Sequence, residues 1–323
     1  MRLLVVTAVA VVVLLVGQVT VAGASVAVDE YSPDSVGLRI SGGIPRVRVD
    51  AADIYQSNLE FEEAINQRIA DIWHAFGERA RSVSAISLEY ETEHIVDGYY
   101  HFIVIYADIV SSTHSREVGV VGFDAHRRTI LSLEDVLGPN AQPLARAHIA
   151  ARMRAQPGLF NSVPTSDGVG LYSGKMQRFY TRGGYVMFLF DQGEIAPARS
   201  GVVRIPLERA RVHNTSFAPH EYIRMDEFNL KMVPLRAAVE GLGFSLEWDD
   251  GDNAILISRA DTSPIRVRIG QNLYEQDTRP PMSLESPPIL HQGLTFVPIS
   301  FFETILGAFY STNEHGVVTI TIM

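Results

Sequence analysis

Residues 232–250 have the sequence MVPLRAAVEGLGFSLEWDD, and NAILIS follows at residues 253–258. Pro234 stands at the start of an apolar stretch and Gly243 just past its end, the usual places for these residues around a helix. The hydrophobic runs Phe244 to Trp248 and Ala254 to Ser258 flank an Asp-Gly turn, which predicts a β-hairpin. We therefore expect a helix followed by two paired strands.

The same unit returns near the C-terminus. Val297-Pro298-Ile299-Ser300 opens a second helix that ends at Leu306-Gly307, and the runs Ala308 to Ser311 and Val317 to Ile322 predict its strands. Repeated units of this kind bury each other's apolar faces. The second copy has Ser300 where the first has Arg236, and it lacks the Trp-Asp pair. The repeat predicts a small helix-plus-hairpin domain over residues 221–323.

This repeat resembles the copper amine oxidase N-terminal-like domain, a stalk module of bacterial surface proteins. The resemblance lies in the VPLR helix start, the LG helix end, the W-D turn and the V-T-I strand. In the oxidases the module lies apart from the copper and quinone centre. The resemblance therefore implies a stalk, with neither copper nor oxidase activity.

Residues before the repeat combine one clear helix with β-type runs. In 58–80, apolar residues recur at helical spacing and predict a helix with one face on a core: Ile65, Ile69, Ile72 and Phe76. Strands are predicted at 84–92, 99–110 and 118–123 with a turn at Asp97-Gly98, then a helix at 143–155, a loop at 156–174 and strands at 184–191 and 202–206. The fold class is α+β, with a largely antiparallel sheet and a covering helix.

Two stretches of residues 44–210 resemble the RsiV/PdaC-type extracellular domain. They are GFDAHRRTILSLEDVLG (122–138) and FYTRGGYVMFLFDQGEIAPARSGVVRIP (179–206). Gly193 and Ala198 replace two tyrosines of that family, and Ser111 to His114 stand where its Gly-Gly-Ala-His segment would fall. In RsiV the domain recognises lysozyme, and in PdaC it accompanies a separate catalytic domain. The resemblance implies an envelope-facing α+β binding domain.

The N-terminus has the features of an export signal. Met1-Arg2 precede an apolar run from Leu3 to Val16, and Ala22-Gly23-Ala24 has the A-x-A form of a cleavage site. The run is shorter than the roughly 20 residues that cross a bilayer. We therefore expect residues 1–24 to be a signal peptide or a membrane anchor, 25–43 to be a linker, and the rest to be extracytoplasmic, secreted or anchored by this segment alone.

Composition excludes several classes of function. The 323 residues are enough for about two domains. There is no cysteine, which excludes disulfides, thiolate metal sites and cysteine nucleophiles. The net charge of −10 opposes binding to nucleic acid.

No motif predicts a catalytic residue, a metal site or a cofactor. The ten histidines form no H-x-H or H-E-x-x-H pair. His101 is expected to be structural, and Asp249 to Asn253 a hairpin turn instead of a calcium loop. Gly168 to Lys175 lacks the residues of a phosphate loop. Glu91 and Glu93 share a strand face, where solvated alternation is an alternative to glycosidase chemistry.

The candidate binding residues are aromatic side chains and one histidine. Phe179, Tyr180 and Tyr185 lie near the predicted sheet and are candidates to line a groove for sugar or peptide, although core packing is the favoured interpretation of aromatic residues there. His114, in a polar segment, is the fourth candidate. We expect a non-catalytic envelope protein that binds a wall glycan or an extracellular protein. An enzyme acting on wall polymer and a purely structural spacer are the alternatives.

Overall fold

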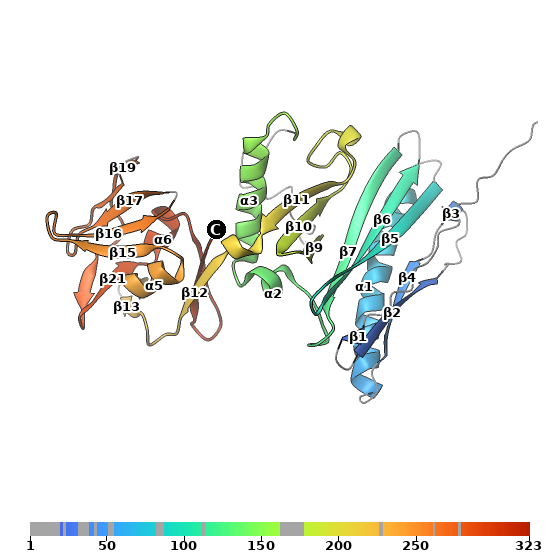
Figure 1. The fold of residues 1–323 in the computed structure, drawn as a ribbon, viewed down its shortest axis with the longest axis horizontal. Helices are drawn as coiled ribbons and strands as arrows, with labels where there is room; N and C mark the ends of the chain where they lie inside the picture. Colours follow the sequence, from blue (N-terminus) through green and yellow to red (C-terminus); the bar gives the residue numbers. More distant parts are fainter. Residues whose placement is uncertain are drawn as a thin grey trace, which may run out of the picture. The chain divides into compact units, whose positions relative to one another are not determined.

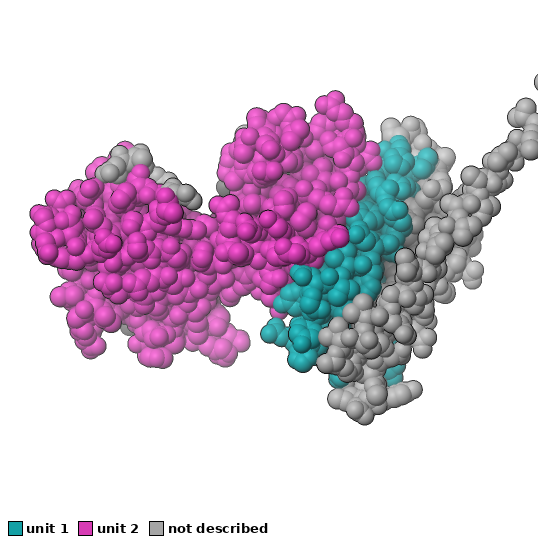
Figure 2. Space-filling view, viewed as in Figure 1, with its two compact units in different colours: residues 1–130 teal, residues 131–323 magenta. Residues whose placement is uncertain are grey.

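A computed structural model gives the architecture of the chain (Figure 1). The structure describes residues 20–21, 24–31, 39–41, 44–50, 55–81, 87–110, 114–161, 178–225, 229–260, 262–276 and 279–323. The chain divides into two compact units, residues 1–130 and 131–323, which Figure 2 distinguishes by colour. Antiparallel sheets with a few helices make up both units, so the predicted α+β class is confirmed.

The first unit contains two sheets and one long helix. A sheet in the order β1-β2-β4 is antiparallel, and a second sheet has the order β3-β5-β6-β7-β8, in which β3 is parallel to β5. The elements are β1 (Thr20–Val21), β2 (Ala24–Tyr31), β3 (Arg39–Ser41), β4 (Ile44–Asp50), α1 (Tyr55–Arg81), β5 (Ser87–Asp97), β6 (Tyr100–Val110), β7 (His114–Asp124) and β8 (Thr129–Ile130).

Helix α1 packs on one face of the second sheet. Its apolar stripe is buried against the inward side chains of β6 and β7, in a core of Phe61, Ile65, Ile69, Phe76, Ile103, Ile105, Ala107, Ile109, Val121 and Phe123. Gly98, with a φ of 65°, lies in the turn between β5 and β6. The helix, the hairpin and the strands predicted here are confirmed. The segment expected as a linker differs, because backbone pairing places β2 and β3 within it.

The first part of the second unit holds two helices and a three-stranded antiparallel sheet in the order β11-β10-β9. A capping box between Ser132 and Asp135 begins α2. The elements are α2 (Leu133–Leu137), α3 (Ala141–Ala155), β9 (Phe179–Arg182), β10 (Tyr185–Phe190), the 3-10 helix η1 (Ala198–Ser200), β11 (Val203–Glu208) and the 3-10 helix η2 (Arg209–Arg211). Most of the loop predicted at 156–174, and the Gly168 to Lys175 stretch, lie outside the described residues.

The rest of the second unit has three sheets that all contribute to one large core, and a smaller apolar cluster lies on the β13-β14-β21-β20 sheet. Their orders are β12-β23-β22, β13-β14-β21-β20 and β15-β16-β17-β18-β19. The elements are β12 (His213–Phe217), β13 (Ile223–Met225), β14 (Leu230–Pro234), α5 (Leu235–Gly241), β15 (Ser245–Asp249), β16 (Ala254–Arg259), β17 (Thr262–Val267), β18 (Tyr274–Gln276), β19 (Arg279–Met282), β20 (Ile289–His291), β21 (Leu294–Pro298), α6 (Ser300–Thr304), β22 (Phe309–Thr312) and β23 (Val318–Ile322).

Both predicted helix-plus-hairpin units are present. Helices α5 and α6 each follow a strand that ends in proline, and β15–β16 and β22–β23 are their hairpins. The Asp249 to Asn253 segment is a turn, in which the Asp249 carboxylate accepts hydrogen bonds from the backbone N–H groups of Gly251 and Asp252. The predicted repeat is therefore confirmed.

Asn140 ties the two parts of the second unit together. Its buried side-chain amide donates hydrogen bonds to the Thr319 carbonyl at 3.0 Å and to Thr321 Oγ1 at 2.9 Å. The Thr321 hydroxyl in turn donates to Asn214 Oδ1 at 2.5 Å. Because a buried amide needs partners, this network fixes the start of α3 on the β12-β23-β22 sheet.

Candidate ligand-binding cavity and sheet cluster

Three side chains form a row across the end of the β11-β10-β9 sheet. Tyr185 pairs with Arg182 on one side and with Glu208 on the other, and directly paired residues on antiparallel strands point to the same face. Tyr185 is 43% exposed, and Arg182 and Glu208 are also exposed. The sheet thus presents a cation, an aromatic ring and a carboxylate side by side.

Two residues of this row, Tyr185 and Glu208, line a cavity of about 430 Å³ within the second unit. The β9–β10 turn, α2, η2 and β12 supply its walls: Val136, Leu137, Gly183, Gly184, Tyr185, Glu208, Arg209, Ala210, Val212 and Asn214. The Arg209 N–H donates to the Gly184 carbonyl at 2.9 Å, which holds η2 against the turn. Gly183 and Gly184 have φ of 59° and 87°, a conformation that favours glycine and keeps this wall free of side chains.

Asn214 is a fixed polar group of the cavity wall. Its Nδ2 donates to the Leu137 carbonyl at 3.4 Å, and its Oδ1 accepts from Thr321. The orientation of this amide is therefore set by the protein before any ligand arrives. Glu208 and Arg209 add opposite charges to the same wall. An aromatic ring with a few oriented polar groups in a concave site is typical of a small-ligand pocket.

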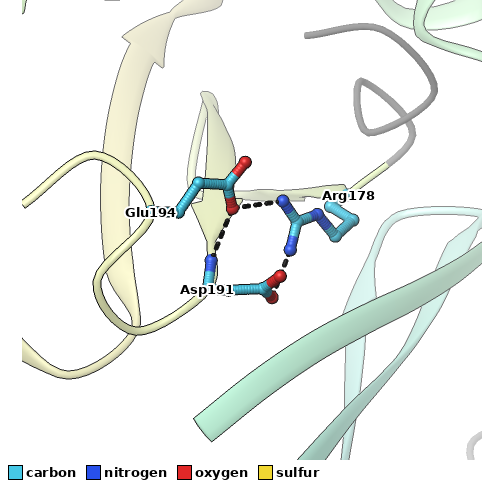
Figure 3. A network of polar contacts seen from close by, with 3 residues as sticks. All are labelled: Arg178, Asp191 and Glu194. Atoms are coloured by element: carbon cyan, nitrogen blue, oxygen red, sulfur yellow. Dashed lines mark hydrogen bonds and ion pairs between the residues drawn. The ribbon is translucent and has the colours of Figure 1, made fainter. Parts of the chain in front are cut away.

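An ion network supports the opposite end of the same sheet. Arg178, just before β9, forms ion pairs with Asp191 and with Glu194, the second at 2.6 Å (Figure 3). Glu194 also accepts the Asp191 N–H at 2.9 Å. The three side chains are 11–14% exposed. This network closes the loop after β10 and has a structural role at the end away from Tyr185.

The four predicted binding residues have different surroundings in the structure. Tyr185 lines the cavity, whereas Phe179 and Tyr180 are 2% and 6% exposed and are packed in the protein. His114 lies in the first unit, on β7. The binding role of each remains a prediction. Sequence analysis did not identify Glu208, Arg209 and Asn214 as candidates, because they lie in segments without a motif. The sequence feature that could have indicated this site is the pair Gly183-Gly184 between two apolar strands.

His114 belongs to a polar cluster on the β5-β6-β7 sheet. Its Nε2 is 3.1 Å from Asp108 Oδ1, and Asp108 Oδ2 is 3.3 Å from Arg116. The sheet cluster, as we name it, consists of Glu91, Glu93, Tyr106, Asp108, His114 and Arg116. Within it Arg116 pairs with Glu91, and the Tyr106 hydroxyl donates to Glu93 at 3.2 Å.

His148 and His101 have lowered pKa values. Burial lowers the pKa of His148 below its usual value of 6.5. A hydrogen bond to the Pro206 carbonyl raises this pKa, and the positive charges of Arg152 and Arg211 lower it. Burial likewise lowers the pKa of His101 to about 4. His101 is 2% exposed and lies 3.1 Å from His94, as expected of a structural residue.

These features define an α+β protein with a preformed concave site in its second unit.

Residues 221–321 match the family model of the copper amine oxidase N-terminal domain, which confirms the resemblance of the C-terminal repeat. A comparison with curated proteins found no match. Among solved structures, the chain is similar to a DUF3298 family protein from Pseudomonas aeruginosa PAO1, at 13% identity and TM-score 0.35, over 58% of this chain and 90% of that one. A DUF3298 member from Bacteroides fragilis gives 12% identity and TM-score 0.33, over 54% and 81%. Neither structure is similar enough to carry an argument about function.

The residues of the matched domain do not fit a copper site. Its histidines are His291 and His315. In the parts of the chain that the structure describes, no three His, Asp or Glu side chains come together as metal ligands. The same parts contain no helix that is long and apolar enough to cross a membrane. The N-terminal 19 residues, on which the export prediction rests, lie outside the described residues.

Proposed function

We propose that the chain is an extracytoplasmic envelope protein that binds a wall glycan in the cavity beside Tyr185 and catalyses no reaction. The observation that carries this proposal is the cavity itself, where an exposed tyrosine lies between polar side chains. Sugar rings stack on aromatic faces, while their hydroxyls need oriented donors and acceptors such as Asn214 and Glu208. The export signal predicted from the sequence of residues 1–24 supports the location.

A glycan suits this site better than a folded protein partner. The cavity, about 430 Å³, is in the range of pockets for small ligands, roughly 300–1,000 Å³. A stable protein interface instead needs about 800 Å² on each partner. The C-terminal domain would then serve as the stalk, which its match to a copper amine oxidase N-terminal domain supports. A spacer without any ligand would not need the cavity.

Replacing Tyr185 by alanine tests the proposal. The full chain is mixed with purified insoluble peptidoglycan, sedimented, and the free fraction is measured. We expect Tyr185→Ala to weaken binding by roughly five- to ten-fold, because one aromatic stacking contact contributes about 1–1.5 kcal/mol. Tyr310→Ala is the matched control, since Tyr310 is 39% exposed and lies on β22.

The result has three informative outcomes. Loss of binding in Tyr185→Ala alone supports the cavity, and equal loss in both variants rejects it. No sedimentation of the unmodified chain rejects glycan binding. In that case, capture of lysozyme by the same preparation would favour an extracellular protein as the ligand.

The sheet cluster favours one second candidate, an enzyme acting on wall polymer. A histidine held by a carboxylate, as His114 is held by Asp108, is the arrangement that orients a general base. This candidate requires release of sugar or acetate from the wall polymer by the full chain. The release must disappear in His114→Gln and persist in His126→Gln, which replaces an exposed histidine at the other end of β7. Such a result would reject a purely binding role.

A further inference from the structure

Positive charge is concentrated in the part of the chain that carries the cavity. Residues 131–212 contain ten Arg or Lys and six Asp or Glu, whereas the whole chain has a net charge of −10. Two of the six acids, Asp191 and Glu194, are paired with the partly buried Arg178. The remaining cations of this segment are therefore in clear excess over its carboxylates.

Several of these cations lie in or beside the cavity. Arg209 lines it, and Arg182 pairs across the strands with Tyr185. Within the described residues, neither guanidinium forms an ion pair with a carboxylate, although Glu208 lies in the same row. An arginine without an anionic partner at the rim of a pocket is free to bind a carboxylate or phosphate in bidentate fashion.

The positive charge continues away from the cavity. Arg211 ends η2, two residues after Arg209, and Arg152 lies in the last turn of α3. His148 of α3 lies against β11, the strand just before η2, because its Nε2 is 2.8 Å from the Pro206 carbonyl. Arg152 lies one helical turn after His148 on α3, and the charges of Arg152 and Arg211 both contribute to lowering the pKa of His148. Neither forms an ion pair within the described part of the chain.

We propose that the cavity selects a sugar ring that carries an anionic group, and that Arg211 and Arg152 contact further anions of the same polymer. In this arrangement Tyr185 stacks on the ring, Asn214 and Glu208 bind its hydroxyls, and Arg209 and Arg182 bind its carboxylate or phosphate. The proposal rests on the glycan-binding function above and names its ligand class. A nucleic acid is disfavoured by the charge of the whole chain and by Glu208 beside the ring.

Chemical removal of the anions tests this proposal on one wall preparation. One sample is left untreated, one is treated with hydrofluoric acid to remove phosphodiester-linked polymer, and one has its carboxylates converted to neutral amides. We expect one of the two treatments to weaken sedimentation of the full chain by about ten-fold or more, since a hydrogen bond to a charged group contributes about 1.5–3 kcal/mol. The treatment that does so identifies phosphate or carboxylate as the anion.

Arginine variants link the effect to the cavity. Arg209→Gln and Arg182→Gln should each weaken binding to untreated wall by about ten-fold. Each variant should then bind treated and untreated wall with nearly the same affinity, because the arginine that recognises the anion is missing. Arg199→Gln is the control, because it removes one exposed cation of the same segment at the opposite end of the β10–β11 hairpin. Unchanged unfolding midpoints for the three variants establish that binding alone has changed.

The outcomes distinguish the two proposals. If both treated walls bind as well as untreated wall, the anion preference is rejected and glycan binding remains. An equal loss in Arg199→Gln also rejects it, since net charge would then account for the effect. If untreated wall does not bind, the glycan-binding function itself is rejected.

Discussion

At the scale of single residues, the most informative group is the pair His94 and His101. Their rings are stacked with 24° between the ring planes, and His94 Nε2 and His101 Nδ1 share a hydrogen bond of 3.1 Å. The His101 ring also stacks on Phe123, with 5.3 Å between the ring centroids. A histidine in this position is held neutral, because burial and the neighbouring His94 outweigh the opposite effect of Asp124 on its pKa.

This pair predicts a loss of stability in mild acid. The pKa of His101 is lowered from 6.5 to about 4 in the folded protein, so between these values the unfolded chain binds the proton and the folded chain does not. The free energy of unfolding therefore falls as the pH drops below 6.5. Between pH 7 and pH 5 we expect His101 to account for about 2 kcal/mol, measured by urea unfolding of the first unit.

His101→Leu provides the comparison. This variant lacks the titrating ring, so the difference in unfolding free energy between pH 7 and pH 5 should shrink by about the same 2 kcal/mol. A difference as large as that of the unmodified chain would show that His101 titrates normally in the fold.

At the scale of elements, periodic segments were predictable and short ones were not. The apolar stripe of α1 extends over several turns, and its spacing alone predicts both the helix and its buried face. Helix α2 has five residues, too few to show a period, and depends on the Ser132 capping box. Strand β9 has four residues and is fixed by pairing with β10, a contact that a local pattern cannot show.

The cavity was predictable only in part for a related reason. Tyr185 stands out as an aromatic residue beside a glycine pair, so sequence alone identifies it as a candidate. Glu208, Arg209 and Asn214 meet it through sheet register and through the docking of α2, which join segments far apart in the sequence. Phe179 and Tyr180 are aromatic residues of the kind that often bind ligands, but both are buried in the protein.

The packing of α1 on β7 gives a prediction at this scale. A Cβ on Gly119 would lie 2.4 Å from Ile72 Cγ2, closer than atoms can approach. Gly119→Ala should therefore push the helix from the sheet and reduce the free energy of unfolding by about 1–3 kcal/mol. Gly158→Ala is the control, since nothing lies within 4 Å of the Cβ it would gain. Equal unfolding midpoints for the two variants would contradict this packing.

At the scale of the molecule, the C-terminal domain extends beyond the residues that match the family. The match begins at residue 221, but β12 at His213–Phe217 pairs with β23 over five residues. Phe217 is 5% exposed and belongs to the same core as Val233, Phe301 and Ile320. Thr215 lies so close to Gly241 of α5 that a Cβ there would be 2.8 Å from its hydroxyl. This domain is therefore complete only with β12.

Two pieces of the chain test this boundary. The buried residues of the core extend from Phe217 to Ile322, so residues 213–323 contain all of them, whereas residues 221–323 lack the strand and its phenylalanine. Losing a buried phenylalanine costs about 3–5 kcal/mol, and 1 kcal/mol shifts the melting temperature of a domain this size by roughly 4–8 °C. We expect the shorter piece to melt at least about 10 °C lower, or to be unfolded. Phe217→Ala in the longer piece should reproduce most of that loss, because the strand then remains while its anchor is removed. Equal melting temperatures for the two pieces would instead place the boundary at residue 221 and make β12 a dispensable edge of the sheet.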